Sequence, residues 1–221
     1  MSSRVIELLI NSFTQILIPG IVYTIPLTLI SFGLGLLIAI ITALLQVANV
    51  KVLKQICQFY VWIFRGTPLM VQLFIIFYGL PNLGFIIPAL PSAVIAFSLN
   101  VGAYASETIR GSILSVPQGQ REAAYSVGMT YVQSMIHIIL PQALKMSIPA
   151  LFNTFISLVK DTSLAASITV TEMFQVTQTI AARTYEPLAM YIEVAFIYLM
   201  FCTALTYVQK YIEKKWNLKK S

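Results

Sequence analysis

Residues 122–141 of the chain read EAAYSVGMTYVQSMIHIILP. This stretch is rich in small and polar residues, and it lies between two long apolar segments. The rest of the chain is mostly apolar, as in a protein embedded in a lipid bilayer, so this polar stretch stands out. A polar loop of this kind between two membrane spans can serve as the contact site for a soluble partner protein. The stretch therefore favours a membrane subunit driven by a partner over a simple membrane anchor.

The composition around this stretch indicates an integral membrane protein. The 221 residues are 58% hydrophobic and 10% charged, with a mean hydropathy of +0.83, whereas soluble domains carry roughly 25% charged residues. No charged residue occurs from Leu8 to Val50 or from Gly66 to Ser106. A spanning helix needs about 20 apolar residues, so each run can hold one or two crossings. We therefore predict an all-α integral membrane fold in one domain, residues 1–221.

The apolar runs divide into five predicted spans and one long polar loop, residues 110–140. Pro19, Gly20 and Pro26 interrupt the first run, so we expect the residues before them to form a separate helix at the membrane surface. Residues 81–84 (PNLG) are turn formers without charge, and we expect a turn there. The predicted spans are residues 21–46, 53–80, 85–106, 141–163 and 187–209.

The basic residues are distributed unevenly about these spans. If the long loop is cytoplasmic, ten basic residues lie inside and only Arg4 and Arg183 lie outside, with Arg65 and Lys160 at membrane depth. Cytoplasmic loops carry the excess of basic residues, so we expect the N-terminus outside and the C-terminus in the cytoplasm. The net charge of +6 follows from this bias, and we expect no nucleic-acid surface. The ten inner residues are Lys51, Lys54, Arg110, Arg121, Lys145, Lys210, Lys214, Lys215, Lys219 and Lys220.

The long loop has a helical pattern in two parts. Residues 121–127 (REAAYSV) are helix formers and small residues. Gly128 is expected to break this helix or to cap it in the left-handed conformation. A second amphipathic stretch, residues 132–139, is expected to end at Pro141, which lacks a backbone N–H. We therefore expect two short helices at an angle to each other at the inner membrane surface.

The first of these helices offers a surface that a partner protein can approach. Ala123 and Ala124 are small enough to let another backbone come close, Tyr125 adds an apolar side chain, and Glu122 can pair with a cation. The alternative is an interfacial helix that rests on lipid headgroups. The residues alone leave both interpretations open.

Here the sequence resembles a known family. EAA, three residues, Gly, nine residues, Ile, one residue and Leu-Pro are similar to the loop signature of permease subunits of bacterial ABC importers. Residues 20–29, 64–69 and 160–164 resemble the polar amino-acid branch of that family (histidine, glutamine, arginine and cystine permeases), and within it the Gram-positive cystine permeases most. The signature positions are filled by Glu122, Ala123, Ala124, Gly128, Ile138, Leu140 and Pro141.

The resemblance implies a specific assembly in a bacterial plasma membrane. The loop, Tyr125 included, would form cytoplasmic coupling helices that sit in a groove on a separate ATPase subunit. Two permease subunits, often two copies of one chain, would form the pathway from five-helix importer cores. An extracellular binding protein would deliver a polar amino acid, with cystine as the first choice. The chain itself would perform no covalent chemistry, so neither enzyme activity nor a cofactor is expected.

Charged and polar residues at membrane depth are candidates for the substrate path. Arg65 can brace a break caused by Pro68, or it can line the path. The run at 160–163 can be an ion pair followed by a cap for the next helix, or it can line the pathway, where an amino acid needs partners for its ammonium and carboxylate. The four residues of this run are Lys160, Asp161, Thr162 and Ser163.

Two further expectations concern polar segments beside the spans. Glu107 is expected to pair with Arg110, one helical turn later, and not to bind a ligand. Residues 169–184 are too polar to span, and they suit an outer gate or a docking surface for the delivering protein.

Other classes of function fit the residues less well. His137 is the only histidine, which argues against a metal site or a His-based catalytic pair. The chain has no GxxxxGK[ST] loop for binding ATP itself. The main alternative is an ion-coupled secondary amino-acid transporter, a class that usually shows inverted repeats and acidic groups near the bilayer midplane. Five spans do not divide into equal halves, and Asp161 and Glu193 fall toward the outer side.

Overall fold

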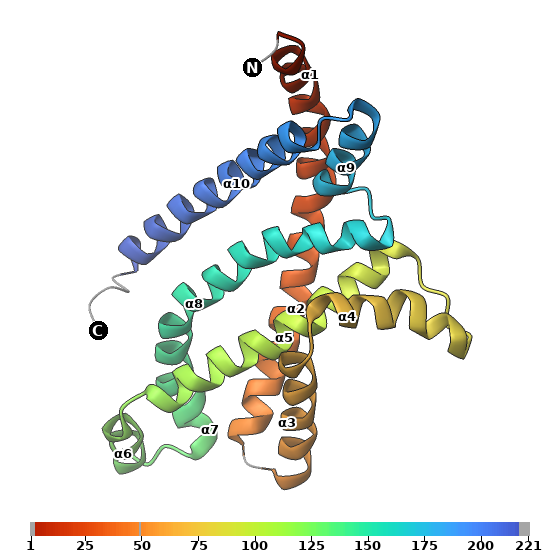
Figure 1. The fold of residues 1–221 in the computed structure, drawn as a ribbon. Helices are drawn as coiled ribbons and strands as arrows, with labels where there is room; N and C mark the ends of the chain where they lie inside the picture. Colours follow the sequence, from red (N-terminus) through yellow and green to blue (C-terminus); the bar gives the residue numbers. More distant parts are fainter. Residues whose placement is uncertain (1–2, 49, 217–221) are drawn as a thin grey trace.

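The computed structural model describes residues 3–48 and 50–216, and these are helical almost throughout, with no strand among them. Lys219 and Lys220, two of the ten residues assigned to the inner side, lie outside the described residues. The chain begins with α1 (Ser3–Pro19), a π-helical turn η1 (Gly20–Thr24) and α2 (Ile25–Val47). Together they form one helix of 44 residues from Arg4 to Val47, roughly 66 Å long at 1.5 Å per residue. Figure 1 shows it running through the whole molecule.

The expected break before the first span is wrong. Pro19 ends α1 with helical dihedrals, and Pro26 occupies the first turn of α2. The π-helical turn between them shifts the hydrogen-bonding register, so the missing N–H groups of both prolines are accommodated without a change of direction. The helix that contains the predicted span 21–46 therefore starts about 17 residues earlier.

The region predicted as one span at 53–80 is two helical pieces at a sharp angle. They are α3 (Lys51–Gly66) and the succession α4 (Leu69–Phe74), η2 (Ile75–Gly79) and η3 (Leu80–Leu83), and they are bent by 106°. Pro68 restricts the residue before it to extended backbone, and Thr67 accordingly has φ −121° and ψ 147°. The turn expected at 81–84 is present, and Gly84 closes it with φ +87°.

The remaining helices are α5 (Ala89–Ser115), α6 (Gln118–Ser126), α7 (Tyr131–Ser134), η4 (Met135–Ile139), α8 (Leu140–Asp161), η5 (Thr162–Ile168), α9 (Met173–Thr184) and α10 (Pro187–Lys215). Of these, α5 and α10 end later than the predicted spans 85–106 and 187–209. The polar loop thus begins after Ser115 and not at Arg110, because α5 continues for more than one turn past Arg110. The polar segment 169–184 is mostly the helix α9.

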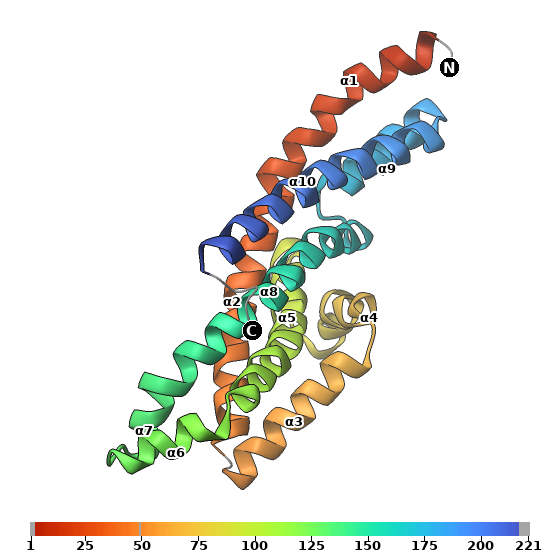
Figure 2. The same ribbon diagram turned by 90° about the vertical axis from the view of Figure 1, so that its left-hand side faces the viewer.

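The helices pack into two apolar clusters along the first long helix (Figure 2). The larger cluster joins α2, α4, α5 and α8, with Phe97 and Leu158 fully or nearly fully buried. The smaller joins α1, α9 and α10 around Ile16, Met173 and Ile197. Helices α2 and α5 cross closely because glycine lies at their contact: a Cβ built on Gly102 of α5 would lie 2.8 Å from a methyl carbon of Ile38 on α2, and one built on Gly35 of α2 would lie 2.7 Å from a methyl carbon of Val101 on α5.

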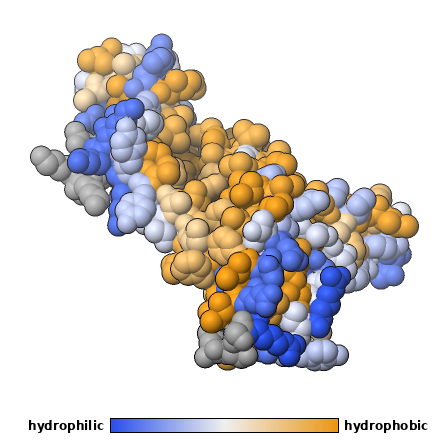
Figure 3. Space-filling model, turned by 90° about the horizontal axis from the view of Figure 1, so that it is seen from above, coloured by the Kyte–Doolittle hydropathy of each residue, from blue (hydrophilic) through white to orange (hydrophobic). Residues whose placement is uncertain are grey.

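Much of the surface is apolar, as a lipid-facing protein requires. Figure 3 shows hydrophobic residues forming a broad continuous area across the visible face, with hydrophilic residues gathered toward its ends. Four helices among the described residues are long and apolar enough to cross a membrane, or five if the bent pair counts as one span. The higher number agrees with the five spans that the sequence predicts.

Candidate coupling surface and polar cleft

The predicted coupling loop forms a compact element at one end of the molecule. Helices α6 and α7 lie together beyond the end of α5 and lead into α8 (Figures 1 and 2). The α6 helix is tied back to α5 because Nη2 of Arg121 donates to the carbonyl of Ile113 at 3.1 Å. A displacement of α6 by a partner would therefore reach the end of α5 directly.

The first coupling helix ends as the sequence predicts. Gly128 has φ +81°, and the N–H groups of Gly128 and Met129 donate to the carbonyls of Tyr125 (2.9 Å) and Ala124 (3.1 Å). These two bonds form a Schellman motif, which satisfies carbonyls that the helix leaves free. No atom lies within 4 Å of a Cβ built on Gly128, so glycine is needed for its backbone conformation and not for space.

The exposed side of α6 differs from the prediction at one residue. Glu122, Ala123 and Tyr125 are exposed, but Ala124 is only 4% exposed and faces the protein. Helix α6 packs against η4, which explains why a small residue is needed on this side. Ala124 therefore belongs to the internal contact of the loop, and the surface open to a partner consists of Glu122, Ala123, Tyr125 and the 73% exposed Val127.

The second coupling segment does not end at Pro141. A capping box opens it: Thr130 Oγ1 accepts from Gln133 N at 3.3 Å, and Gln133 Oε1 accepts from Thr130 N at 2.9 Å. The T-x-x-Q spacing could have revealed this start. The helix then continues from Tyr131 to Ile168, with Pro141 in the first turn of α8 after the π-helical turn. Ile138 and Leu140 pack against the larger apolar cluster.

A polar cleft of about 470 Å³ lies further along this same helix. Its walls come from the break between α3 and α4, from α5 and from α8. Asp161 is the only acidic residue among its lining residues, and the other polar ones are Thr67, Asn100, Tyr104, Asn153, Thr154 and Ser157. The cleft therefore combines hydroxyl and amide groups with one carboxylate.

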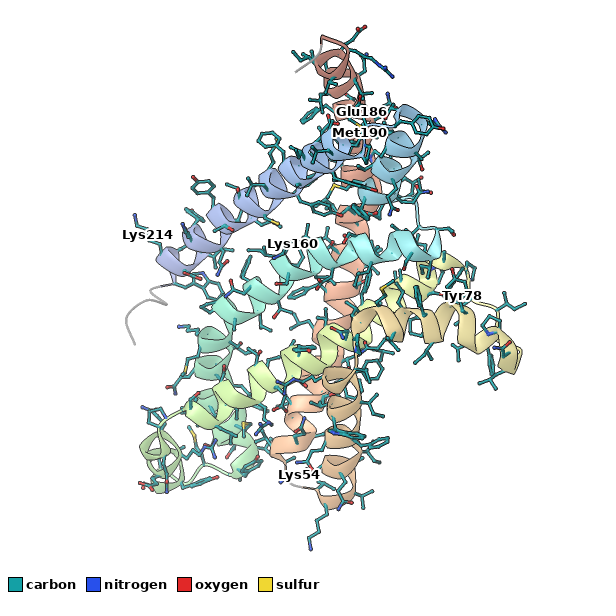
Figure 4. The ribbon with its side chains drawn as sticks, in the orientation of Figure 1. Lys54, Tyr78, Lys160, Glu186, Met190 and Lys214 are labelled. Atoms are coloured by element: carbon teal, nitrogen blue, oxygen red, sulfur yellow. The ribbon has the colours of Figure 1, made fainter. Side chains whose placement is uncertain are left out.

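Three of the five residues predicted for the substrate path line cavities. Asp161 lines the polar cleft, whereas Lys160 and Ser163 line a second, mostly apolar cavity of about 570 Å³ between α8, α9 and α10. Lys160 also lines a third hollow of about 430 Å³, which shares Asn153 and Ser157 with the polar cleft. Figure 4 shows Lys160 on the side of α8 that faces α10. Thr162 is fully buried, and its hydroxyl donates to the carbonyl of Val159 at 2.7 Å. In the described part of the chain, no ion pair within 4.0 Å joins Lys160 and Asp161.

The break beside the cleft is held by Gln72 and Asn100, which were not among the predicted site residues. The carbonyl of Phe64 would accept from residue 68 in a continuous helix, but Pro68 has no N–H. Nε2 of Gln72 supplies that donor at 2.9 Å and also reaches the carbonyl of Thr67 at 3.0 Å. Asn100 Nδ2 donates to Gln72 Oε1 at 3.0 Å and so joins α5 to the break. A glutamine four residues after a proline, in a run without charged residues, was the available signal.

Arg65 lies next to the break, but its side chain contacts Glu107 and Tyr104 on α5. Its Nη1 is 3.9 Å from Oε2 of Glu107, and its guanidinium carbon lies 5.4 Å from the ring centre of Tyr104. The pairing expected between Glu107 and Arg110 is confirmed, with Nη2 and Nε of Arg110 donating at 2.7 and 3.0 Å. Arg65 is therefore not a residue of the cleft wall and does not hydrogen-bond the broken backbone.

A buried carboxylate opens α9 in the predicted gate segment. Glu172 is fully buried, and its Oε1 accepts from Gln175 N at 2.7 Å while Oε2 accepts from the Tyr198 hydroxyl at 3.1 Å. It, and not Thr162 or Ser163, caps the helix. Burial raises the pKa of the Glu172 carboxyl, and the hydrogen bonds oppose this only in part.

Comparison with known proteins identifies the family of this chain. The family described as "Binding-protein-dependent transport system inner membrane component" matches residues 31–218. The L-cystine transport system permease protein TcyB of Bacillus subtilis (strain 168) is 55% identical over 210 residues, 95% of this chain and 90% of that protein. The arginine transport system permease protein ArtQ of the same organism is 36% identical over 200 residues, 90% of this chain and 91% of that protein.

Solved structures agree with this family. A crystal structure of an amino acid ABC transporter with histidines matches with a TM-score of 0.90 and 33% identity over 97% of this chain and 100% of that chain. An inward-facing MetNI methionine ABC transporter matches with a TM-score of 0.70 and 20% identity, over 98% of this chain and 99% of that chain, and shares the fold. The predicted all-α importer-permease fold is thereby confirmed, and the ion-coupled alternative is disfavoured. The chain belongs to the family of inner membrane components of binding-protein-dependent transport systems, the permeases of ABC transporters.

Proposed function

We propose that this chain is the transmembrane subunit of an ATP-driven importer that carries a polar amino acid, cystine first, into the bacterial cell. The observation that carries the proposal is the continuity of one helix from Tyr131 to Ile168. Its first turns belong to the exposed coupling loop, and Asp161 near its far end lines the polar cleft. A movement at one end of such a helix is passed to the other as a rigid-body shift.

The exposed side of α6 is the proposed contact for a separate ATPase subunit. Tyr125 and Val127 offer apolar area, being 48% and 73% exposed, and Ala123 lets a partner approach the backbone. The Glu122 carboxylate is held by Gln118 at 2.9 Å on one side and is exposed on the other, where a partner's cation can pair with it. ATP binding would draw two ATPase subunits together and move α6 with them, so hydrolysis takes place on the partner and not on this chain.

The cleft is the proposed binding site for the substrate on its way from the outside to the cytoplasm. Asp161 would pair with the ammonium group of an amino acid, and the side chains of Asn100, Asn153 and Ser157 would bond its other polar groups. Lys160 and Ser163 lie at the second cavity, and we assign them a place on the path outside the cleft. Cystine is the first choice because the cystine permease of Bacillus subtilis is 55% identical.

The remaining parts of the assembly are proposed from the family and the charge distribution. An extracellular binding protein would deliver the amino acid, and a second copy of the chain would complete the pathway. The N-terminus would lie outside and the C-terminus in the cytoplasm, because α10 ends with Lys214 and Lys215 and the coupling loop carries Arg121.

Reconstitution with the cognate ATPase and binding protein tests this function. Gly128→Asp adds a Cβ to a backbone at φ +81°, which residues other than glycine rarely adopt, so we expect uptake and ATPase association to fall while the protein stays inserted. Gly33→Ala is the matched control, because no atom lies within 4 Å of a Cβ built there and its helical backbone tolerates alanine. Amino-acid uptake that persists in vesicles without any ATPase subunit would overturn the proposal in favour of an ion-coupled transporter.

A further inference from the structure

Three charged side chains meet between the cleft and the coupling loop. Glu107 and Arg110 lie on α5, in the part that leads to α6, and Arg65 lies at the end of α3. Glu107 receives two hydrogen bonds from Arg110, at 2.7 and 3.0 Å, and lies 3.9 Å from Arg65. In residues 3–48 and 50–216, the contact between Arg65 and Glu107 is the only ion pair within 4.0 Å that joins two helices.

The two ion pairs of Glu107 differ in strength. Its pair with Arg110 is bidentate and lies within one helix, so it moves as a unit with α5. Its pair with Arg65 is long, and the Arg65 side chain is 45% exposed, so this contact is weak and easily separated. Separation would leave the Glu107 carboxylate paired with Arg110, and the half-exposed Arg65 guanidinium would keep its contact with the Tyr104 ring and with solvent.

The position of this pair connects the two functional regions. Arg65 immediately precedes the residues at which the helix breaks, and Thr67 of that break lines the cleft, as does Tyr104. On the other side, α5 ends eight residues beyond Glu107, where Arg121 of α6 bonds the carbonyl of Ile113. A shift of α6 would therefore move Glu107 relative to Arg65.

We propose that Glu107 is a positioning residue that ties the wall of the substrate cleft to the coupling loop through Arg65. In the arrangement seen here the pair holds the α3–α4 break against α5. When the ATPase moves α6 and the end of α5, the weak pair separates, the break is released, and the cleft changes shape. The inference rests on the proposed function, since it assigns a regulating contact to the same cleft.

The test is a double-mutant cycle on the coupling of ATP hydrolysis to uptake. Glu107→Gln, Arg65→Gln and the double variant are reconstituted with the cognate ATPase and binding protein, with Glu7→Gln, exposed on α1, as the control. We expect each single variant to raise ATP hydrolysis without substrate and to lower substrate carried per ATP several-fold. The double variant should be no worse than Glu107→Gln alone, because once Glu107 is replaced the Arg65 substitution has no ion pair left to remove. Arg65→Lys should restore part of the coupling.

The outcomes separate this inference from the function on which it rests. Arg65→Gln leaves the pair between Glu107 and Arg110 intact, so it tests the inference even if Glu107→Gln does not fold. Additive effects of the two substitutions, or coupling equal to that of Glu7→Gln, would overturn the inference alone. A wild-type protein that takes up amino acid without the ATPase would overturn both.

Discussion

The side-chain amide of Asn100 on α5 donates a hydrogen bond at 3.0 Å to Gln72 on α4. Gln72 in turn donates to the carbonyl of Phe64, which Pro68 leaves without its helical partner. One wall of the polar cleft is thus held by two neutral amides. A neutral pair suits a site at membrane depth, since it satisfies the broken backbone without burying a charge.

Removing this amide should weaken the fold at the cleft. Gln72→Leu removes the side-chain donor of the Thr67 carbonyl and leaves the Phe64 carbonyl with only the longer bond from Asn100 Nδ2 at 3.4 Å, so we expect a loss of about 1–3 kcal/mol in unfolding free energy. Denaturant unfolding in detergent measures this loss. Gln15→Leu, on the exposed side of α1, is the control. Equal stability of the two variants would show that the break does not depend on Gln72.

The crossing of α2 and α5 should not tolerate a methyl group. In Gly102→Ala the new Cβ would lie 2.6 Å from the Tyr60 hydroxyl and 2.8 Å from a methyl carbon of Ile38. Such overpacking costs about 1–3 kcal/mol, which should appear as a lower thermal midpoint. Gly33→Ala has open space and should keep or raise the midpoint, because alanine favours helix by up to about 1 kcal/mol. A Gly102→Ala protein as stable as Gly33→Ala would contradict this packing.

The stability of the protein should depend on pH through Glu172, which lies between the last two candidate spans. Burial raises the pKa of its carboxyl above the ordinary value of 4.5. A raised pKa in the folded state contributes stability that is fully present below about pH 4.5 and is lost as the pH rises through the folded pKa. Glu172→Gln removes this titration and keeps an acceptor for the N–H of Gln175.

Thermal midpoints between pH 4.5 and 8 measure this effect. We expect the wild-type midpoint to fall relative to that of Glu172→Gln as the pH rises. Glu186→Gln, at the start of α10, controls for general effects of removing a carboxylate. Parallel curves for the wild type and Glu172→Gln would contradict the prediction.

The two cavities predict different roles for neighbouring residues of α8. Asp161→Asn should reduce uptake by about 10- to 100-fold, mainly through KM, because a charge-assisted bond to the substrate's ammonium contributes about 1.5–3 kcal/mol. Lys160→Gln, in the second cavity, should have a smaller effect. Radiolabelled amino-acid uptake over a range of concentrations separates the two. A larger KM effect at Lys160 than at Asp161 would place the substrate in the other cavity.

Local chemistry made several features of the loop predictable. The left-handed cap at Gly128 and the pairing of Glu107 with Arg110 depend on residues within one or two helical turns, and both are confirmed. The apolar composition likewise indicated the membrane fold. The coupling signature was visible as a spacing of residues, without knowledge of their contacts.

Features that depend on tertiary packing could not be predicted in this way. Proline rules predicted breaks at Pro19 and Pro141, but π-helical turns carry the helix through both. The burial of Ala124 depends on η4 packing against α6. Lys160 and Asp161 are adjacent in sequence and therefore point about 100° apart around a helix, and only the neighbours of α8 decide which one meets the cleft.

The contact between the coupling loop and an ATPase can be measured directly by photo-cross-linking from Tyr125. Replacing Tyr125 with p-benzoyl-phenylalanine puts the probe on the exposed side of α6. The same replacement at Tyr23, on the first long helix, is the control, because the two tyrosines are 48% and 43% exposed. We expect Tyr125 to give a cross-link to the cognate ATPase that weakens in Gly128→Asp, and Tyr23 to give none. Cross-links from Tyr125 to lipid alone would mean that the loop rests on headgroups, and would contradict the coupling role.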